Sequence, residues 1–260
     1  MLKLGIPVLN RGELLLRLVG SIDVPAEVLV VVNSIGPTDE SVLAAVEELG
    51  TEVKVVRVPG NLGVAGSWNF ILDHFGGDCV ISNSDIEFAP GVLGDVLGRI
   101  VPDVVMQHLW AAACFYAGAE FTRRLGWFDE NIYPAYHEDQ EIALRAAALG
   151  VEVCDVLSLE DGRITHGGSQ TLRNASESVQ QFIGQAKGLS GAYLERRWGA
   201  IPELGRELPE RRFPFDNAAL HPADWTLDLS ARAAVARLCE EVTGFACPIV
   251  YHRAEGGLCP

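Results

Sequence analysis

Apolar runs alternate with helical patterns through the first hundred residues, and this alternation limits the possible folds more than any other feature. The apolar runs are KLGIPVL, EVLVVVN, EVKVVRV and DCVISNS. They are separated by segments of about 12 residues with helical spacing of their apolar side chains, such as DESVLAAVEELG. Continuous apolar strands separated by helices are typical of parallel sheets with both faces covered. The sequence therefore predicts an α/β fold with a mostly parallel sheet flanked by helices.

The pattern changes after residue 100. DVVMQHLWAAACFYAG is expected to form one or two strands, and VEVCDVL a further strand. From about residue 170 the pattern becomes helical, first in SESVQQFIGQAKGLSGAYLERRWG and then, after a connector rich in Pro and Arg, in LSARAAVARLCEEVTG at 229–244. We therefore predict a sheet domain over residues 1–170 and a mainly helical extension over residues 171–260.

The charge balance argues against several classes of partner. The chain has 35 acidic and 20 basic residues and a formal net charge of −15, which opposes binding to nucleic acid or to anionic membranes. No apolar run reaches the roughly 18 residues of a membrane span, and the amino terminus lacks the apolar run of a secretory signal. The cysteines form no C-x-x-C pair, and Cys79, Cys114 and Cys154 lie in apolar runs, as buried free thiols do. We expect a cytoplasmic protein that binds no nucleic acid and has no transmembrane segment.

Polar or flexible residues follow several of the predicted strands. Asn33 follows the second strand, GNLGVAGSWN the third, NSDIEF the fourth, and SLEDGRITHGG a later one. In open parallel sheets, ligands bind at the carboxyl ends of the strands, so these segments are expected to meet around one cleft. The glycines of the second segment suit a tight strand-to-helix turn, and they also permit a ligand to approach backbone N–H groups.

Asp85 and His166 are candidate metal ligands. Asp85 follows a run that should be buried strand, so it could either form a turn or bind Mg²⁺ or Mn²⁺ together with substrate phosphates. His166 is a single histidine among glycines, and such residues are more often not ligands. If the two strand ends are neighbours, however, the imidazole and the carboxylate could share one metal ion.

The stretch YHEDQEIALRAAALG predicts a helix over residues 138–149. Its inward stripe is expected to consist of Ile142, Ala146 and Leu149. Asp139 lies three residues before that stripe and is expected on the same face, where a carboxylate needs a partner or a cleft. Glu141 and Arg145 are expected to pair on the opposite, outward face. Glu138 and Glu141 fit the usual preference for acids in a first helical turn, so Asp139 is the candidate for chemistry.

These stretches resemble the family 2 glycosyltransferases, whose nucleotide-sugar-binding fold is called GT-A. GNLGVAGSWNFIL is similar to the N-x-G-x-x-x-x-x-N stretch of the family, and SNSDIEFAPGVL to its D-x-D region. GWFDENIYPAYHEDQEIALRAAALG looks like the segment that carries its ED motif, and this is the most specific part. IPVLNRGELLLRLVGSI and VVVNSIGPTDES match its opening elements. The resemblance covers roughly residues 2–170.

The resemblance implies a metal-dependent, inverting transfer of a sugar from a UDP-, dTDP- or GDP-linked donor to a hydroxyl of a carbohydrate, protein or small molecule. It implies that Asp85 and His166 hold Mn²⁺ or Mg²⁺ against the diphosphate, with residues 171–260 on the acceptor side. It further implies Asp139 as the catalytic base and Glu138 as a supporting acid. The implied donor-binding residues are Pro7, Asn10, Asn33, Asn61, Gly63, Asn69, Asn83, Ser84 and Asp85.

Two departures from the family pattern and two rival functions bear on this interpretation. Asn33 stands where the family often has Asp, and Asn83 replaces the first acid of the D-x-D region. A non-catalytic nucleotide-sugar- or glycan-binding relative would have lost the base or the metal ligands, which this chain retains. A sugar nucleotidyltransferase would need a basic, glycine-rich loop after the first strand, where PVLNRGE offers only Arg11.

Overall fold

A seven-stranded sheet with the order β3-β2-β1-β4-β7-β6-β8 forms the centre of the molecule. The computed structural model describes residues 1–34, 38–49, 53–58, 60–101, 103–157, 162–168, 173 and 176–198, and a few isolated positions from 237 onward. The strands of the sheet are β1 (Leu2–Val8), β2 (Ala26–Val32), β3 (Lys54–Arg57), β4 (Cys79–Ser82), β6 (Met106–Trp110), β7 (Cys114–Ala117) and β8 (Val153–Asp155). β3, β2, β1 and β4 are mutually parallel, β7 is antiparallel to its two neighbours, and β8 is parallel to β6. The predicted mostly parallel sheet is confirmed.

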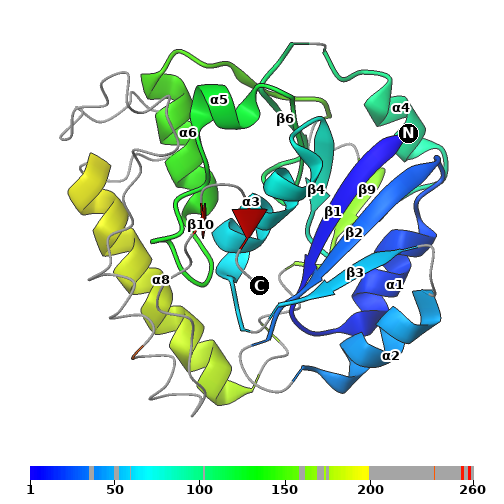
Figure 1. Cartoon of the computed structure of the whole chain (residues 1–260), viewed down its shortest axis with the longest axis horizontal. Coiled ribbons are helices and arrows are strands. Elements are labelled where there is room, and N and C mark those ends of the chain that lie inside the picture. Colours follow the sequence, from blue (N-terminus) through cyan, green and yellow to red (C-terminus); the bar gives the residue numbers. More distant parts are fainter. Residues whose placement is uncertain are drawn as a thin grey trace.

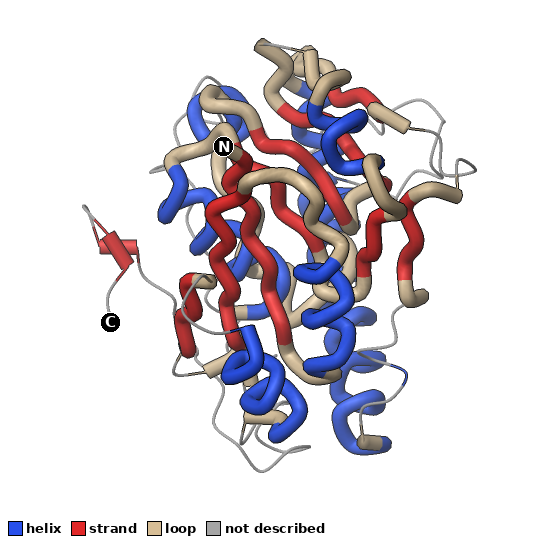
Figure 2. Tube along the Cα trace, turned by 90° about the vertical axis from the view of Figure 1, so that its right-hand side faces the viewer, coloured by secondary structure: helices blue, strands red, loops and turns tan. Residues whose placement is uncertain are grey.

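Helices cover both faces of this sheet, as the views in Figures 1 and 2 show. They are α1 (Gly12–Gly20), α2 (Glu40–Leu49), α3 (Gly63–Phe75), α4 (Val92–Leu97), α5 (Phe121–Leu125), α6 (Glu138–Ala148) and α8 (Glu177–Trp198). Val30 and Val32 of β2 pack in a core with α1, α2 and α4, whereas Leu29 and Val31 pack in a second core with α3, α5 and α6. Burial on both faces explains why this strand reads as a continuous apolar run rather than an alternating one.

Two further pairs of short strands lie outside the main sheet. β5 (Ile86–Phe88) pairs with β9 (Ile164–His166), and β10 (Arg253–Ala254) pairs with β11 (Gly257–Leu258), both in antiparallel orientation. In the part of the chain that the structure describes, no helix combines the length and the apolar character needed to span a membrane.

The helix predicted at the start of the extension is present as α8 and packs against the sheet domain. Figure 1 shows it in yellow along one edge of the molecule, beside α6. Leu144 of α6 lies in one apolar cluster with Tyr193, Leu194 and Trp198 of α8. The Tyr193 hydroxyl also donates a hydrogen bond to Asp129 Oδ2 at 2.7 Å. The second predicted helix, at 229–244, lies outside the described residues apart from one helical position, 237.

The predicted inward stripe of α6 is confirmed, because Ile142 and Ala146 are buried in the core and Leu149 packs against it, but the faces predicted for three other residues are wrong. Glu141 and Arg145 were expected to point outward, but both side chains are completely buried and form an ion pair. Arg145 Nη1 also donates to the carbonyl oxygens of Leu125 and Trp127, at 2.8 and 2.6 Å. Asp139, expected on the inward face, is exposed. Arg145 is covered by the segment at 125–127 and Leu144 by α8, so the buried surface of α6 is wider than the stripe that faces the sheet.

The buried pair gives a first prediction. Arg145→Met leaves the Glu141 carboxylate buried without its cation, so we expect a loss of about 3–5 kcal/mol in the free energy of unfolding. Urea denaturation measures this loss. Arg99→Met is the matched control, because Arg99 pairs with Asp95 at the same i, i+4 spacing on the surface; it should change stability very little. Equal effects of the two substitutions would contradict the assigned role of Arg145.

Candidate functional site

A pocket opens at the carboxyl ends of β1, β2 and β4, where the polar segments were expected to meet. Pocket-lining residues also come from the segment before α6, namely Pro134, Ala135 and Tyr136, and from α8, namely Ile183. Nine of the residues proposed from the sequence line it: Pro7, Asn33, Asn61, Gly63, Asn83, Ser84, Asp85, Glu138 and His166. Segments that are far apart in the sequence therefore contribute to one concave site, which is the usual form of a small-molecule site in such sheets.

Three other proposed residues, Asn10, Asn69 and Asp139, are not among the residues that line this pocket. The Asn69 amide donates to the Phe128 carbonyl oxygen at 2.9 Å and to Glu130 Oε1 at 2.7 Å, and it accepts from the Phe128 N–H at 2.9 Å. Asn69 thus ties α3 to the segment that leads into the ED stretch. Asp139 is exposed, and its Oδ1 accepts from the Gln140 N–H at 2.9 Å.

Asn33 joins the end of β2 to the start of α3. Its Nδ2 donates to Ser67 Oγ at 2.9 Å, and its Oδ1 accepts from the Leu62 N–H at 3.0 Å. Ser67 in turn donates to the Gly63 carbonyl oxygen at 2.6 Å. Ser67 also lines the pocket, although the sequence analysis did not select it. Its position one helical turn after Gly63 is the signal that could have identified it.

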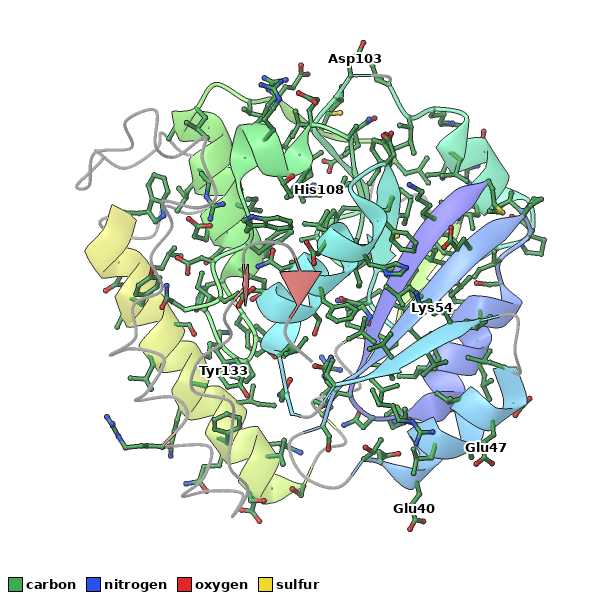
Figure 3. All side chains as sticks on the ribbon, viewed as in Figure 1. Glu40, Glu47, Lys54, Asp103, His108 and Tyr133 are labelled. Atoms are coloured by element: carbon green, nitrogen blue, oxygen red, sulfur yellow. The ribbon has the colours of Figure 1, made fainter. Side chains whose placement is uncertain are left out.

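Gly63 allows the two walls of the pocket to approach each other. It has a φ of 72°, and a Cβ atom there would lie 2.8 Å from Tyr133 Cδ2 and 2.9 Å from the Pro134 carbonyl oxygen. The next residue, Val64, donates its N–H to that same oxygen at 2.7 Å. Tyr133, which Figure 3 labels beside α8, donates its hydroxyl to the Asn61 carbonyl oxygen at 3.1 Å. The glycine is required both for its backbone conformation and for this close contact.

Asp85 and His166 are neighbours, as a shared metal site requires. Pairing of β5 with β9 places Ile86 opposite His166, and His166 Nε2 lies 3.2 Å from Asp85 Oδ1. The Gly167 N–H donates to the Asp85 carbonyl oxygen at 2.8 Å, which holds the two strands in this register. Among the described residues, no group of three or more His, Cys, Asp or Glu could hold a metal ion. A carboxylate and an imidazole still fit Mg²⁺ or Mn²⁺ when substrate phosphates supply further ligands.

Glu138, the first residue of α6, is a buried acid that lines the pocket. Burial, with a further contribution from the neighbouring charge of Asp139, raises the pKa of its carboxyl group to about 8. Within the described part of the chain, its Oε2 has no hydrogen-bond partner. A carboxylic acid kept protonated near neutral pH can donate a hydrogen bond to a ligand.

The contact at Gly63 gives a prediction with an internal control. Gly76 has a similar φ of 70°, but a Cβ atom there would meet nothing within 4 Å. Both glycine-to-alanine substitutions carry the cost of a left-handed backbone. We expect Gly63→Ala to lose about 1–3 kcal/mol more than Gly76→Ala in urea denaturation, because only Gly63 is crowded. If the two variants are equally stable, the close contact with Tyr133 and Pro134 is not required.

The raised pKa of Glu138 predicts a pH-dependent effect on stability. Between the ordinary pKa of 4.5 and the folded value of about 8, the folded chain keeps a proton that the unfolded chain releases. The contribution of Glu138 to the stability of the wild-type protein therefore falls as pH rises through this range, by up to ~1.4 kcal/mol per pH unit. Glu138→Gln has no proton to lose, so its stability relative to wild type should increase with pH across that range.

Urea denaturation at about pH 5 and about pH 8 measures this trend. Glu47→Gln is the control, because Glu47 is an exposed acid on α2 (Figure 3). Its difference from wild type should stay constant with pH. A constant difference for Glu138→Gln as well would show that the Glu138 carboxyl is ionised in the folded protein at neutral pH.

Glycosyltransferases are among the known proteins that resemble this chain in sequence or in fold. A galactofuranosyl glycosyltransferase of Leishmania donovani is 27% identical over 134 residues, which are 45% of this chain and 30% of that protein. This match thus spans less than a third of the relative's length. The mannosyltransferase PcManGT from Pyrobaculum calidifontis, solved with GDP-Man and Mn²⁺, has a TM-score of 0.51 and 16% identity over 94% of this chain and 73% of that chain. S. aureus TarS 1–349 in complex with UDP has a TM-score of 0.51 and 13% identity over 94% and 72% of the two chains.

At these identities the two solved structures show a shared fold, that of the GT-A glycosyltransferases. The membership follows from the sequence itself. The family described as Glycosyl transferase family 2 matches residues 4–144, which are more than half of the 260 residues. The chain belongs to glycosyl transferase family 2.

Proposed function

We propose that the chain transfers a sugar from a nucleotide-diphosphate sugar to an acceptor hydroxyl, with inversion at the anomeric carbon. The observation that carries this proposal is the single pocket that the strand ends share with the ED stretch. It combines a carboxylate–imidazole pair, a protonated acid and the start of α3. The GDP-Man and UDP bound by the two proteins of similar fold support a nucleotide donor. The family resemblance adds dTDP-linked sugars to these candidate donors.

In this proposal Asp85 and His166 would hold Mn²⁺ or Mg²⁺, whose charge stabilises the diphosphate leaving group. Pro7, Asn33 and Asn61 would contact the nucleotide, supported by the turn at Gly63. Asn10 and Asn69 would act on the donor only indirectly, because neither lines the pocket. The cytoplasmic location predicted from the sequence stays a prediction.

The two neighbouring acids, Asp139 and Glu138, would have different roles. Asp139, exposed at the start of α6, would take the proton from the acceptor hydroxyl as that oxygen bonds to the anomeric carbon. The bond from this carbon to the diphosphate oxygen breaks in the same step. Glu138, buried and protonated, would donate a hydrogen bond within the pocket. Because Glu138 lines the pocket and Asp139 does not, Glu138 in its ionised form is the second candidate for the base.

The acceptor would approach from the side of α8. Ile183 of this helix lines the pocket, and Lys187 lies one turn further along with its Nζ 4.6 Å from the centre of the Tyr136 ring. These contacts support an acceptor-side role for the extension at 171–260. Carbohydrate, protein and small-molecule acceptors all fit this description.

The decisive test compares Asp139→Asn with Glu138→Gln. UDP-, GDP-, dTDP- and CMP-sugars, with and without Mn²⁺, are first screened by thermal shift to find the donor. With that donor, Asp139→Asn should lower kcat at least ~10²-fold, while the donor-induced thermal shift is retained. Glu152→Gln, which changes an exposed acid beyond the other end of α6, is the matched control and should leave kcat unchanged.

The outcomes separate the rival functions. If Asp139→Asn keeps the wild-type kcat and Glu138→Gln loses it, Glu138 would be identified as the base. A folded wild-type protein with no shift and no turnover for any donor would favour a non-catalytic relative. Release of pyrophosphate from a sugar phosphate and a nucleoside triphosphate would favour a nucleotidyltransferase.

A further inference from the structure

The imidazole of His166 is held on three sides. Nε2 faces Asp85 Oδ1 at 3.2 Å, and Nδ1 accepts a hydrogen bond from the Gly168 N–H at 3.2 Å. The ring of Trp110 stacks on the imidazole, with 4.6 Å between the ring centroids and an angle of 25° between the planes. Two edges and one face of the ring are therefore in contact with other groups.

Trp110 reaches His166 from a different sheet. It is the last residue of β6, in the main sheet, whereas His166 ends β9, in the small sheet with β5. The pairing of β6 with β7 shifts register between His108 and Trp110, and the next residue, Ala111, has a φ of 42°. Such irregularities re-aim a side chain at the end of a strand. Here the result is that the indole lies on the imidazole while it remains only partly buried in the core.

We infer that Trp110 is a positioning residue for His166. The inference rests on the proposed function, in which His166 and Asp85 share a metal ion. Without the stacked indole, the two edge contacts would be left to restrain the imidazole plane among the contacts of the described residues. The ion would then have to order that ring as it binds, which lowers affinity. A tryptophan chosen only to fill the core would have no such effect on metal binding.

The test measures Mn²⁺ binding directly, from the electron paramagnetic resonance signal of free Mn²⁺. Mn²⁺ is titrated into the 260-residue chain alone and then with UDP or GDP present. We expect Trp110→Leu to weaken Mn²⁺ binding by about 10- to 100-fold, the usual effect of losing a group that orients a metal ligand. Trp110→Phe keeps an aromatic face and should restore most of the affinity. Trp127→Leu removes another partly buried tryptophan, packed in the other core, and should bind Mn²⁺ as the wild type does.

A second readout needs no metal. The indole ring current should shift the proton NMR signals of His166 upfield in the wild-type protein, and Trp110→Leu should abolish that shift. His166→Gln assigns the signals.

Folded Trp110→Leu that binds Mn²⁺ like the wild type would overturn the inference and leave the proposed function intact. Trp110→Phe that binds as poorly as Trp110→Leu would also overturn it, because stacking would not be the cause. A wild-type protein that binds no Mn²⁺ with either nucleotide would refute the proposed metal role itself, and the inference with it.

Discussion

The completely buried guanidinium of Arg145 organises the part of the molecule on which the candidate site depends. It pairs with Glu141 on its own helix and binds the carbonyl oxygens of Leu125 and Trp127, so it joins α6 to the segment that precedes the ED stretch. The same segment receives Asn69 from α3 at Phe128 and Tyr193 from α8 at Asp129. Side chains from three helices thus form hydrogen bonds with the segment at 125–129. A buried charge tolerates little displacement, because each lost partner costs free energy. Through its pair with Glu141, which lies in the first turn of α6, Arg145 also restrains that turn.

A second network joins this segment to the strand ends. Asn33 binds Ser67 and the Leu62 N–H, Ser67 binds the Gly63 carbonyl oxygen, and Val64 binds the Pro134 carbonyl oxygen. The chain of bonds runs from β2, across the start of α3, to the wall that precedes α6. Asp85 and His166, the proposed metal ligands, also line the pocket, with the small sheet of β5 and β9 holding them together. The site is therefore built by separate elements whose relative positions are set by buried polar contacts.

The elements themselves could be predicted from the sequence, because the run EVLVVVN has the composition of a strand buried on both faces and α6 begins where its acids suggest. The proximity of Asp85 to His166 was predicted only on the condition that their strand ends are neighbours, and it arises from the pairing of β5 with β9 in a separate small sheet. Long-range packing could not be predicted from the sequence. The outward face expected for Glu141 and Arg145 assumed that only the stripe facing the sheet is buried, but the segment at 125–127 covers Arg145 as well. Likewise, nothing local to Trp110 indicates that its ring lies on an imidazole 56 residues later or that Asn69 bonds to residues 128 and 130.

The central claim is that Asp85 and His166 bind a divalent cation together with the diphosphate of a nucleotide in the pocket at the strand ends. A crystal structure of the protein with Mn²⁺ and the donor nucleotide, recorded with anomalous scattering from manganese, tests this claim most directly. We predict one anomalous peak in contact with Asp85, His166 and the diphosphate. We also predict that the nucleobase lies near Asn33. A nucleotide bound elsewhere, or a diphosphate in this pocket with no manganese at the Asp85–His166 pair, would contradict it.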